Sequence, residues 1–355
     1  MKRDIIEKAA IQFGNGAPVI EPIGDGLIHR TFKVTFTGND TAIVLQCINQ
    51  RTFSQPENII QNYQMLYGYL EGKQGGVKIP ALVPTHQKKI FWVDAEDNFW
   101  KATRFINNSH SLSVAKNEKD AYQVAKSFAG LTNSLTDINQ LDLYVIIPDF
   151  HNLFLRYQQF EEAVSQATVM RLLRSTHLIS ELRQRKKLVA FYNSLNDETI
   201  YPTRLMHHDC KINNILFDEN TGAVLCPVDL DTVMPGKFFS DLGDMIRTLV
   251  SPVNENSTAW EEIGVRSEYY FAIICGYLDG VCHLLTKTEK VNLHYSGLLM
   301  TYMQSMRFVT DFLNNDIYYK TSYPEQNLNR ALNQFILLEQ LEEFLEKKYH
   351  FRVDG

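Results

Sequence analysis

Residues 207–231 read HHDCKINNILFDENTGAVLCPVDLD, and this stretch decides which fold we expect. Residues 215–217 and 223–230 are apolar runs typical of β-strands. Residues 218–222, between them, are rich in turn formers. The pattern predicts a β-hairpin with its turn centred near Thr221.

Asn214 and Asp229 lie almost equally far from this turn, one at the start of the first strand and one near the end of the second. Residues that face each other across an antiparallel pair are close neighbours. An amide oxygen and a carboxylate held side by side offer the hard oxygen ligands that Mg²⁺ prefers. We therefore expect Asn214 and Asp229 to bind the metal.

Two charged residues precede the hairpin. Asp209 is placed to accept the proton of an attacking hydroxyl, and Lys211 to neutralise a phosphoryl group during its transfer. With His207 and Asn214 they form the pattern His-x-Asp-x-Lys-x-x-Asn, which matches the catalytic loop of kinases position for position. The alternative is a solvated surface hairpin in which Asp and Asn are turn residues. The second carboxylate, Asp229, favours the catalytic interpretation, because a motif gains weight from its structural context.

Charged residues continue after the hairpin with Asp231, Asp241, Asp244 and Arg247. Asp241 precedes the apolar-periodic run LGDMIRTLV, so a helix is predicted over residues 241–251. Helix N-capping explains Asp241 about as well as a catalytic role does.

We expect the residues beside Asp209 to contribute less to catalysis than Asp209 does. We expect His207 to support the loop backbone, whereas His208 is explained as well by a structural as by a functional role. Cys210 is expected to be inert. The cysteines fit neither paired metal ligands nor a disulfide framework, so we interpret all of them as buried apolar residues in a reducing cytoplasm. They are Cys47, Cys210, Cys226, Cys275 and Cys282.

The chain resembles the aminoglycoside phosphotransferase and choline kinase superfamily, and most closely the bacterial N-acetylhexosamine 1-kinases within it. The last two of the segments below are the most particular to the sugar 1-kinases. The resembling segments are EPIGDGLIHRTFKV (21–34), VLQCIN (44–49), MHHDCKINNILFDENTG (206–222), VDLDTVMPG (228–236) and MRFVTDFLNNDIYYKTSYPEQNLNR (306–330).

This resemblance implies an α+β, bilobal, protein-kinase-like fold of the aminoglycoside phosphotransferase type, with a small β-rich N-lobe over residues 1–107 and a larger helical C-lobe over residues 108–355. The periodicity of the sequence agrees with this division. Strands are predicted at 18–22, 31–37, 41–48, 89–93 and 99–106, and N-lobe helices at 3–13 and 56–72. The polar residues 107–113 are predicted to form the hinge. C-lobe helices are predicted at about 118–136, 151–166, 169–195, 241–251, 266–286, 291–314 and 326–348.

The N-lobe carries a candidate nucleotide-binding loop, Gly24, Asp25 and Gly26, although two glycines are explained nearly as well by a plain β-turn. On the third strand, Gln46 stands where the superfamily has a phosphate-binding lysine, and the sugar 1-kinases share this glutamine. We therefore expect Mg²⁺ and Lys211 to supply most of the charge compensation for ATP.

The glycine loop also departs from the sugar 1-kinases, because Leu27 and His29 replace the family's histidine and asparagine. If this loop contacts the sugar, His29 is a substrate residue and the identity of the sugar is open.

The acceptor is expected to bind to the C-lobe. Residues 286–334 hold four acidic and five basic side chains, so there is no acidic surplus to bind an ammonium group. Arg307, Tyr318, Tyr319 and Tyr323 instead offer hydrogen-bond donors and flat apolar faces, which suit a neutral sugar with an amide. Any single one of these tyrosines is explained better by helix packing, but the resemblance places Arg307 at a substrate contact. Tyr318 is the tyrosine that we select as a substrate residue. The methionines at helical spacing are expected to be core, and they are Met300, Met303 and Met306.

The composition is that of an ordinary globular protein. The chain has 355 residues, a net charge of −6 and no long basic run, which argues against a nucleic-acid partner. No apolar stretch is long enough to cross a membrane, and no signal-peptide core or obligatory protein partner is indicated. We expect a cytoplasmic, ATP- and Mg²⁺-dependent kinase that phosphorylates the anomeric hydroxyl of an N-acetylhexosamine. The alternatives are a kinase for another sugar, an amino alcohol or homoserine, and a catalytically silent pseudokinase, which Gln46 would suit.

Overall fold

The computed structural model describes residues 2–23 and 29–353, and the chain divides into two compact units. The predicted boundary at residue 107 lies close to the first break between the units. The sequence did not indicate the two later segments that join the N-terminal unit. The first unit comprises Met1–His110, Asp137–Ile147 and Leu216–Val233, and the second comprises Ser111–Thr136, Pro148–Ile215 and Met234–Gly355.

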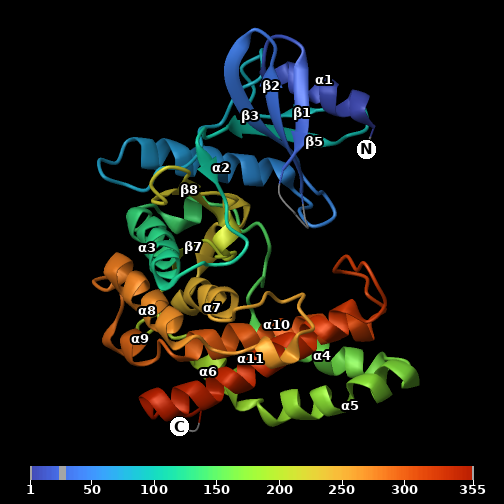
Figure 1. The fold of residues 1–355 in the computed structure, drawn as a ribbon, viewed down its shortest axis with the longest axis vertical. Coiled ribbons are helices and arrows are strands. Elements are labelled where there is room, and N and C mark those ends of the chain that lie inside the picture. Colours follow the sequence, from blue (N-terminus) through green and yellow to red (C-terminus); the bar gives the residue numbers. More distant parts are fainter. Residues whose placement is uncertain (1, 24–28, 354–355) are drawn as a thin grey trace. The chain divides into compact units, whose positions relative to one another are not determined.

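A five-stranded antiparallel sheet forms the centre of the first unit, in the order β1-β2-β3-β5-β4 (Figure 1). Helix α1 (Arg3–Phe13) covers one face of this sheet and packs on alternate strand residues such as Leu45 and Trp100. Because side chains alternate along a strand, Gln46 and Lys101 lie on the opposite face. The strands are β1 (Pro18–Pro22), β2 (Arg30–Phe36), β3 (Asn39–Cys47), β4 (Trp92–Val93) and β5 (Phe99–Arg104).

The predicted hairpin forms in the first unit as β8 (Ile215–Asp218) and β9 (Val224–Pro227). The Asp218 side chain accepts the N–H groups of Asn220 and Thr221 and so fixes the turn. The expected end of the second strand is wrong. Asp229 has a left-handed backbone (φ 59°) and is followed by the 3₁₀ turn Leu230–Thr232.

Two further elements belong to the first unit. Helix α2 (Pro56–Glu71) contacts the turn Leu230–Thr232. The short strand β6 (Ser109–His110) pairs with β8, although the sequence predicted only a hinge there.

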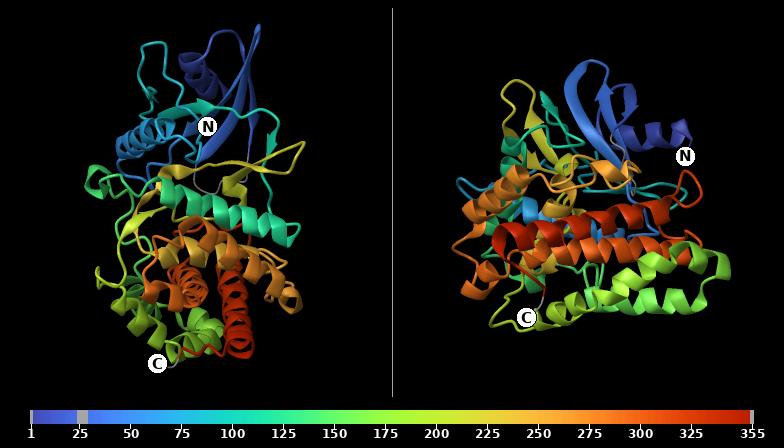
Figure 2. Two further views of the ribbon diagram at one scale, coloured as in Figure 1. Left: turned by 90° about the vertical axis from the view of Figure 1, so that its left-hand side faces the viewer. Right: turned by 60° about the horizontal axis from the view of Figure 1, so that its bottom comes forward.

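The second unit is helical, and two of its longest helices, α10 and α11, lie side by side (Figure 2). It also contains one small antiparallel pair, β7 (Arg204–Met206) with β10 (Met234–Gly236), which was not predicted. The helices are α3 (Glu118–Ser134), α4 (Leu153–Gln166), α5 (Val169–Gln184), α6 (Lys187–Ser194), α7 (Phe238–Leu249), α8 (Ser267–Val281), α9 (Lys287–Val291), α10 (Tyr295–Leu313) and α11 (Gln326–Tyr349).

Two predicted helix boundaries in this unit are wrong. The single helix predicted over 169–195 is broken at Arg185, which leaves helical geometry (φ −91°, ψ 13°). Helix α7 begins at Phe238, so Asp241 lies within its first turn and is not the N-cap. Among the described residues, no helix combines the length and apolarity needed to cross a bilayer.

The cysteine prediction holds only in part. Cys47, Cys210 and Cys226 are buried, Cys275 is half-buried and Cys282 is exposed. Burial, reinforced by nearby carboxylates, raises the pKa of the Cys210 thiol well above its ordinary value, which agrees with the expected inert role.

Close helix contacts in the second unit depend on glycine. A Cβ atom at Gly243 of α7 would lie 2.3 Å from the backbone oxygen of Ser296 and 2.4 Å from Met300 Cγ, both on α10. Gly276 and Gly280 of α8 approach α3 in the same way. All three methionines predicted as core, Met300 among them, are buried.

We predict that Gly243→Ala lowers the free energy of unfolding by about 1–3 kcal/mol, because α7 and α10 must move apart to accept the methyl group. Gly68→Ala is the matched control, since Gly68 lies in α2 with nothing within 4 Å of its added Cβ. It should raise stability by about 0.5–1 kcal/mol through helix propensity. Urea titrations of both variants measure this, and a neutral Gly243→Ala would contradict the close contact.

Candidate active site

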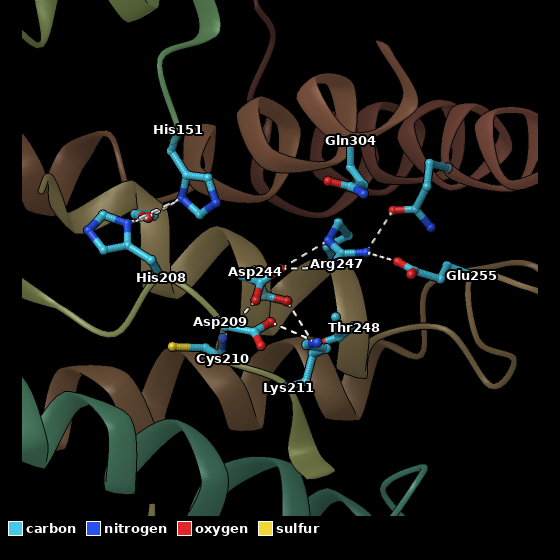
Figure 3. A network of polar contacts seen from close by, with 12 residues as sticks. His151, His208, Asp209, Cys210, Lys211, Asp244, Arg247, Thr248, Glu255 and Gln304 are labelled. Atoms are coloured by element: carbon cyan, nitrogen blue, oxygen red, sulfur yellow. Dashed lines mark hydrogen bonds and ion pairs between the residues drawn. The ribbon is translucent and has the colours of Figure 1, made fainter. Parts of the chain in front are cut away.

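The loop that carries the predicted catalytic residues is anchored by two carboxylates of α7. Asp241 accepts the backbone N–H groups of His207 and His208, at 2.9 and 2.8 Å. Asp244 accepts that of Cys210 at 2.7 Å (Figure 3). Residues three apart on a helix lie on the same face, so both carboxylates of α7 can face the loop. Asp241 is therefore an anchor of the catalytic loop.

His208 has a structural role. Its backbone is left-handed (φ 65°), which is costly for a residue with a side chain. The ring compensates, because Nδ1 lies 2.6 Å from Ser240 Oγ and Nε2 lies 3.2 Å from the Met234 oxygen. A Cβ at Gly236 would lie 2.4 Å from the ring, so only glycine leaves room for it.

His207 supports the loop backbone, as predicted. Its Nδ1 accepts the N–H of Asp209 at 3.3 Å, and its ring packs edge-on against Phe128 with centroids 4.8 Å apart. One ring nitrogen of His207 is therefore occupied by a hydrogen bond to the loop backbone.

Asp209 is held as a charged carboxylate. Lys211 Nζ lies 2.9 Å from Oδ1, and Asn214 Nδ2 donates to Oδ2 at 3.0 Å. Burial alone would raise the pKa of Asp209, but Lys211, His207 and Asn214 outweigh it and the pKa is lowered. The side chain remains 22% exposed, so a hydroxyl group can reach it. The same pairing raises the pKa of Lys211 and keeps it a cation.

The structure brings together three of the predicted residues, Asp209, Lys211 and Asn214. The amide nitrogen of Asn214 is bonded to Asp209, so its Oδ1 is the atom that could bind a metal. Asp229 belongs to the first unit and has an exposed carboxylate. The shared Mg²⁺ site of Asn214 and Asp229 remains a prediction.

A network of ion pairs lies next to this loop, and the sequence indicated only some of its members. Asp244 Oδ1 accepts Arg247 Nε and Nη2 at 3.1 and 2.8 Å, and Arg247 Nη1 reaches Glu255 at 2.5 Å. Burial and the charge of Asp209 raise the pKa of Asp244 despite Arg247. Glu255 belongs to no local motif, so the sequence gave no signal for it.

Comparison with known proteins agrees with this geometry. The family model described as a phosphotransferase enzyme family matches residues 19–265. The chain belongs to this family. It is therefore a small-molecule phosphotransferase.

Solved structures of similar fold cover nearly the whole chain. The microcompartment-associated aminopropanol kinase has 15% identity and a TM-score of 0.68, with 98% of each chain covered. A spectinomycin phosphotransferase in complex with ADP and spectinomycin has 12% identity and a TM-score of 0.60, with 96% of this chain and 99% of that chain covered. The choline kinase from Cryptosporidium parvum has 13% identity and a TM-score of 0.58, with 98% and 97% covered. The predicted superfamily and its protein-kinase-like fold are confirmed.

Arg307, which was predicted to contact the substrate, is connected through aromatic rings to the loop that carries Asp209. Its guanidinium lies 5.2 Å from the ring centroid of Phe150 and donates to Gln304 at 3.2 Å. Phe150 stacks on His151 at 4.4 Å and packs edge-on against His208 at 6.3 Å. The predicted substrate residue thus shares a packed cluster with the residue that precedes Asp209.

The segment after α10 places Tyr318 and Tyr319. Asp311 accepts both of their backbone N–H groups, at 2.7 and 2.9 Å. The Tyr318 side chain is 60% exposed, whereas the Tyr319 ring lies 5.7 Å from the guanidinium of Arg307. The structure therefore places Tyr319 next to Arg307, while substrate contact by Tyr318 remains a prediction.

The predicted residues of the first unit have internal partners. Gln46 Nε2 donates to Thr31 Oγ1 at 3.3 Å. His29 is buried, its Nδ1 accepts the Asn49 N–H at 3.1 Å, and its Nε2 lies 3.2 Å from Asp231 Oδ2. A sugar contact by His29 remains a prediction, and it would require one of these contacts to be exchanged. Gly24, Asp25 and Gly26 lie outside the described residues.

Two buried imidazoles should make stability depend on pH. His151 and His208 both contact the Ser240 hydroxyl, and burial lowers both pKa values below the ordinary 6.5 (Figure 3). The folded state then keeps the rings neutral where the unfolded chain binds protons. We expect the free energy of unfolding to fall as pH drops below 6.5, by up to about 1.4 kcal/mol per pH unit for each ring.

Urea titrations at pH 7.5, 6.5 and 5.5 measure this dependence. His151→Gln should flatten it, and replacement of the exposed His177 is the control. Equal pH slopes for wild type and His151→Gln would contradict the assignment.

We predict that Asp209→Asn lowers kcat by at least about 100-fold while leaving folding and nucleotide affinity nearly unchanged, because it removes a base without changing shape. A coupled ADP-release assay and calorimetric titration with ATP measure the two effects. Asp197→Asn, in a surface turn, is the control. Substantial residual turnover in Asp209→Asn would remove this residue from the base role.

Proposed function

We propose that this phosphotransferase uses ATP and Mg²⁺ to phosphorylate the anomeric hydroxyl of an N-acetylhexosamine, giving the sugar 1-phosphate. The observation that supports this acceptor best is the positive charge around Arg307. Arg156 donates to the backbone oxygen of Phe150 at 3.1 Å, and the guanidinium of Arg307 lies 5.2 Å from the ring centroid of Phe150, so both positive charges lie beside the same residue.

Two neighbouring guanidinium groups disfavour a cationic acceptor, because like charges repel strongly where solvent is partly excluded. Guanidinium and phenol groups donate hydrogen bonds to the hydroxyl and amide oxygens of a sugar. Arg307 and Tyr319 supply these groups beside the cluster that supports the catalytic loop. The resemblance of residues 228–236 and 306–330 to the sugar 1-kinases supports the same acceptor.

The residues of the catalytic loop account for the chemistry. The Asp209 carboxylate orients the sugar hydroxyl and accepts its proton, and an anomeric hydroxyl is more acidic than an ordinary alcohol. As the phosphoryl group approaches, the ammonium of Lys211 compensates its charge. Mg²⁺ held by Asn214 and Asp229 would neutralise the phosphates of the nucleotide. The ADP in the spectinomycin phosphotransferase structure supports ATP as the donor.

A kinase for another sugar or another small metabolite is the alternative, since the similar structures share the fold and leave the acceptor open. A silent pseudokinase is disfavoured by the charged pair of Asp209 and Lys211.

An acceptor screen followed by phosphorus NMR tests the proposal. The purified protein is incubated with ATP and a panel of hexoses, N-acetylhexosamines and amino alcohols, and ADP release is recorded. Because Leu27 and His29 alter the glycine loop, we expect the epimer preference to differ from that of typical sugar 1-kinases. A phosphate doublet coupled to the anomeric proton is expected. A 6-phosphate product, or activity with amino alcohols alone, would overturn the assignment.

We predict that Arg307→Ala raises KM for the sugar by at least about tenfold, the effect of losing one hydrogen bond to a charged group. KM for ATP should change by less than about twofold, because Arg307 binds acceptor and not nucleotide. Arg183→Ala is the control, since Arg183 forms a surface pair with Glu161 at 2.6 Å. Parallel changes in both KM values would argue for a purely structural arginine.

A further inference from the structure

The lysine missing from β3 has a counterpart on the neighbouring strand. Gln46 pairs with Thr31 on one side and with Lys101 of β5 on the other. Directly paired residues project from the same face of a sheet, and adjacent strands are about 4.8 Å apart. Lys101 therefore presents a positive charge on the face where the superfamily presents its phosphate-binding lysine, displaced by one strand.

The partner of this lysine is displaced as well. In kinases a glutamate of the helix that follows β3 holds the lysine. The acidic side chains of α2, Glu57 and Glu71, lie at its two ends, and within the described residues Lys101 forms no ion pair with either. Lys101 is instead paired with Asp231 and lies 5.4 Å from the ring centroid of Tyr63 on α2. The lysine and the glutamate of the superfamily's ion pair are thus both replaced, by Lys101 and Asp231.

Asp231 is held in place by a second contact. The Asn49 N–H donates to Nδ1 of His29, so the proton of the neutral ring is on Nε2, which faces Asp231 at 3.2 Å. Asp231 follows the left-handed Asp229 by two residues, so this pair also restrains the backbone of the predicted metal ligand.

Two simpler interpretations account less well for Lys101. A buried ion pair contributes little net stability, because desolvation of both charges offsets their attraction, so stability alone does not explain a lysine that is 3% exposed. His29, Asp229 and Asp231 have ligand atoms within 4.8 Å of one another, but the ammonium of Lys101 already occupies one oxygen of Asp231. A metal in this cluster would compete with that cation.

We propose that Lys101 is the phosphate-binding cation of this phosphotransferase, with Asp231 holding its ammonium in place. An ammonium has three N–H donors, and within the described residues Asp231 is its one acceptor, so the remaining donors are available to phosphate oxygens. This inference rests on the proposed use of ATP.

The test compares the affinities of adenosine, ADP and ATP by calorimetry. Lys101→Gln should weaken the binding of ADP and ATP by at least about tenfold, because one hydrogen bond to a charged group is lost. The affinity for adenosine should change little. The exchange variant Lys101→Gln/Gln46→Lys returns the charge to β3 and should restore most of the selectivity for ATP over adenosine. Lys73→Gln is the matched control, because Lys73 pairs with Asp137 at 3.2 Å and also lies 5.4 Å from a tyrosine ring.

The outcomes separate the two proposals. The lysine proposal alone is overturned if the wild type binds ATP and a folded Lys101→Gln variant keeps the same selectivity for ATP over adenosine. Failure of a folded exchange variant to regain selectivity also overturns it. A wild type that binds no ATP overturns both proposals. If circular dichroism shows that Lys101→Gln is unfolded, the double variant Lys101→Gln/Asp231→Asn replaces it, because it removes both charges of the pair. The double variant must then show the same loss of selectivity for ATP over adenosine.

Discussion

Three backbone N–H groups of the catalytic loop donate to two buried carboxylates of α7, and the rest of the site depends on these bonds. Buried N–H groups and buried carboxylates each carry a large cost when unpaired. Here each satisfies the other, because Asp241 binds the N–H groups of His207 and His208 while Asp244 binds that of Cys210. Asp209 lies between these anchored residues, so its position is set by the backbone on either side. The left-handed His208 is stabilised in addition by the contacts of its ring with Ser240 and Met234.

The charges around both groups of functional residues are arranged in compensating sets. In the second unit, Asp209 is balanced by Lys211, and Arg247 is balanced by Asp244 and Glu255. In the first unit, Asp231 is balanced by Lys101. Such pairs add little net stability when buried. Their consequence is chemical, because the neighbouring cations lower the pKa values of Asp209 and Asp231, which burial alone would raise.

The part of the site that could be predicted from sequence is the part that is local in sequence. Asp209, Lys211 and Asn214 lie within six residues, and their spacing alone identified the loop that the structure brings together. The hairpin was also predictable, because two apolar runs flank a short segment of turn formers. The helical second unit followed from periodicity.

The unpredicted part depends on contacts between distant residues. His207 and the carboxylate that anchors it are 34 residues apart, and no local pattern reports that Asp241 faces inward from a helix that starts at Phe238. The pairing of Lys101 with Asp231 spans 130 residues and depends on strand register, which places Lys101 opposite Gln46. The left-handed backbone of Asp229 was hidden because the apolar run over residues 223–230 indicates a continuing strand.

Residue-resolved amide hydrogen exchange tests the central claim, which is that α7 holds the catalytic loop through buried carboxylates. Amides that donate to buried acceptors exchange only when the structure opens. The account predicts that the amides of His207, His208 and Cys210 exchange as slowly as those in the middle of α7, although they belong to a loop. Exchange of these three amides at the rate of an exposed surface loop would contradict it.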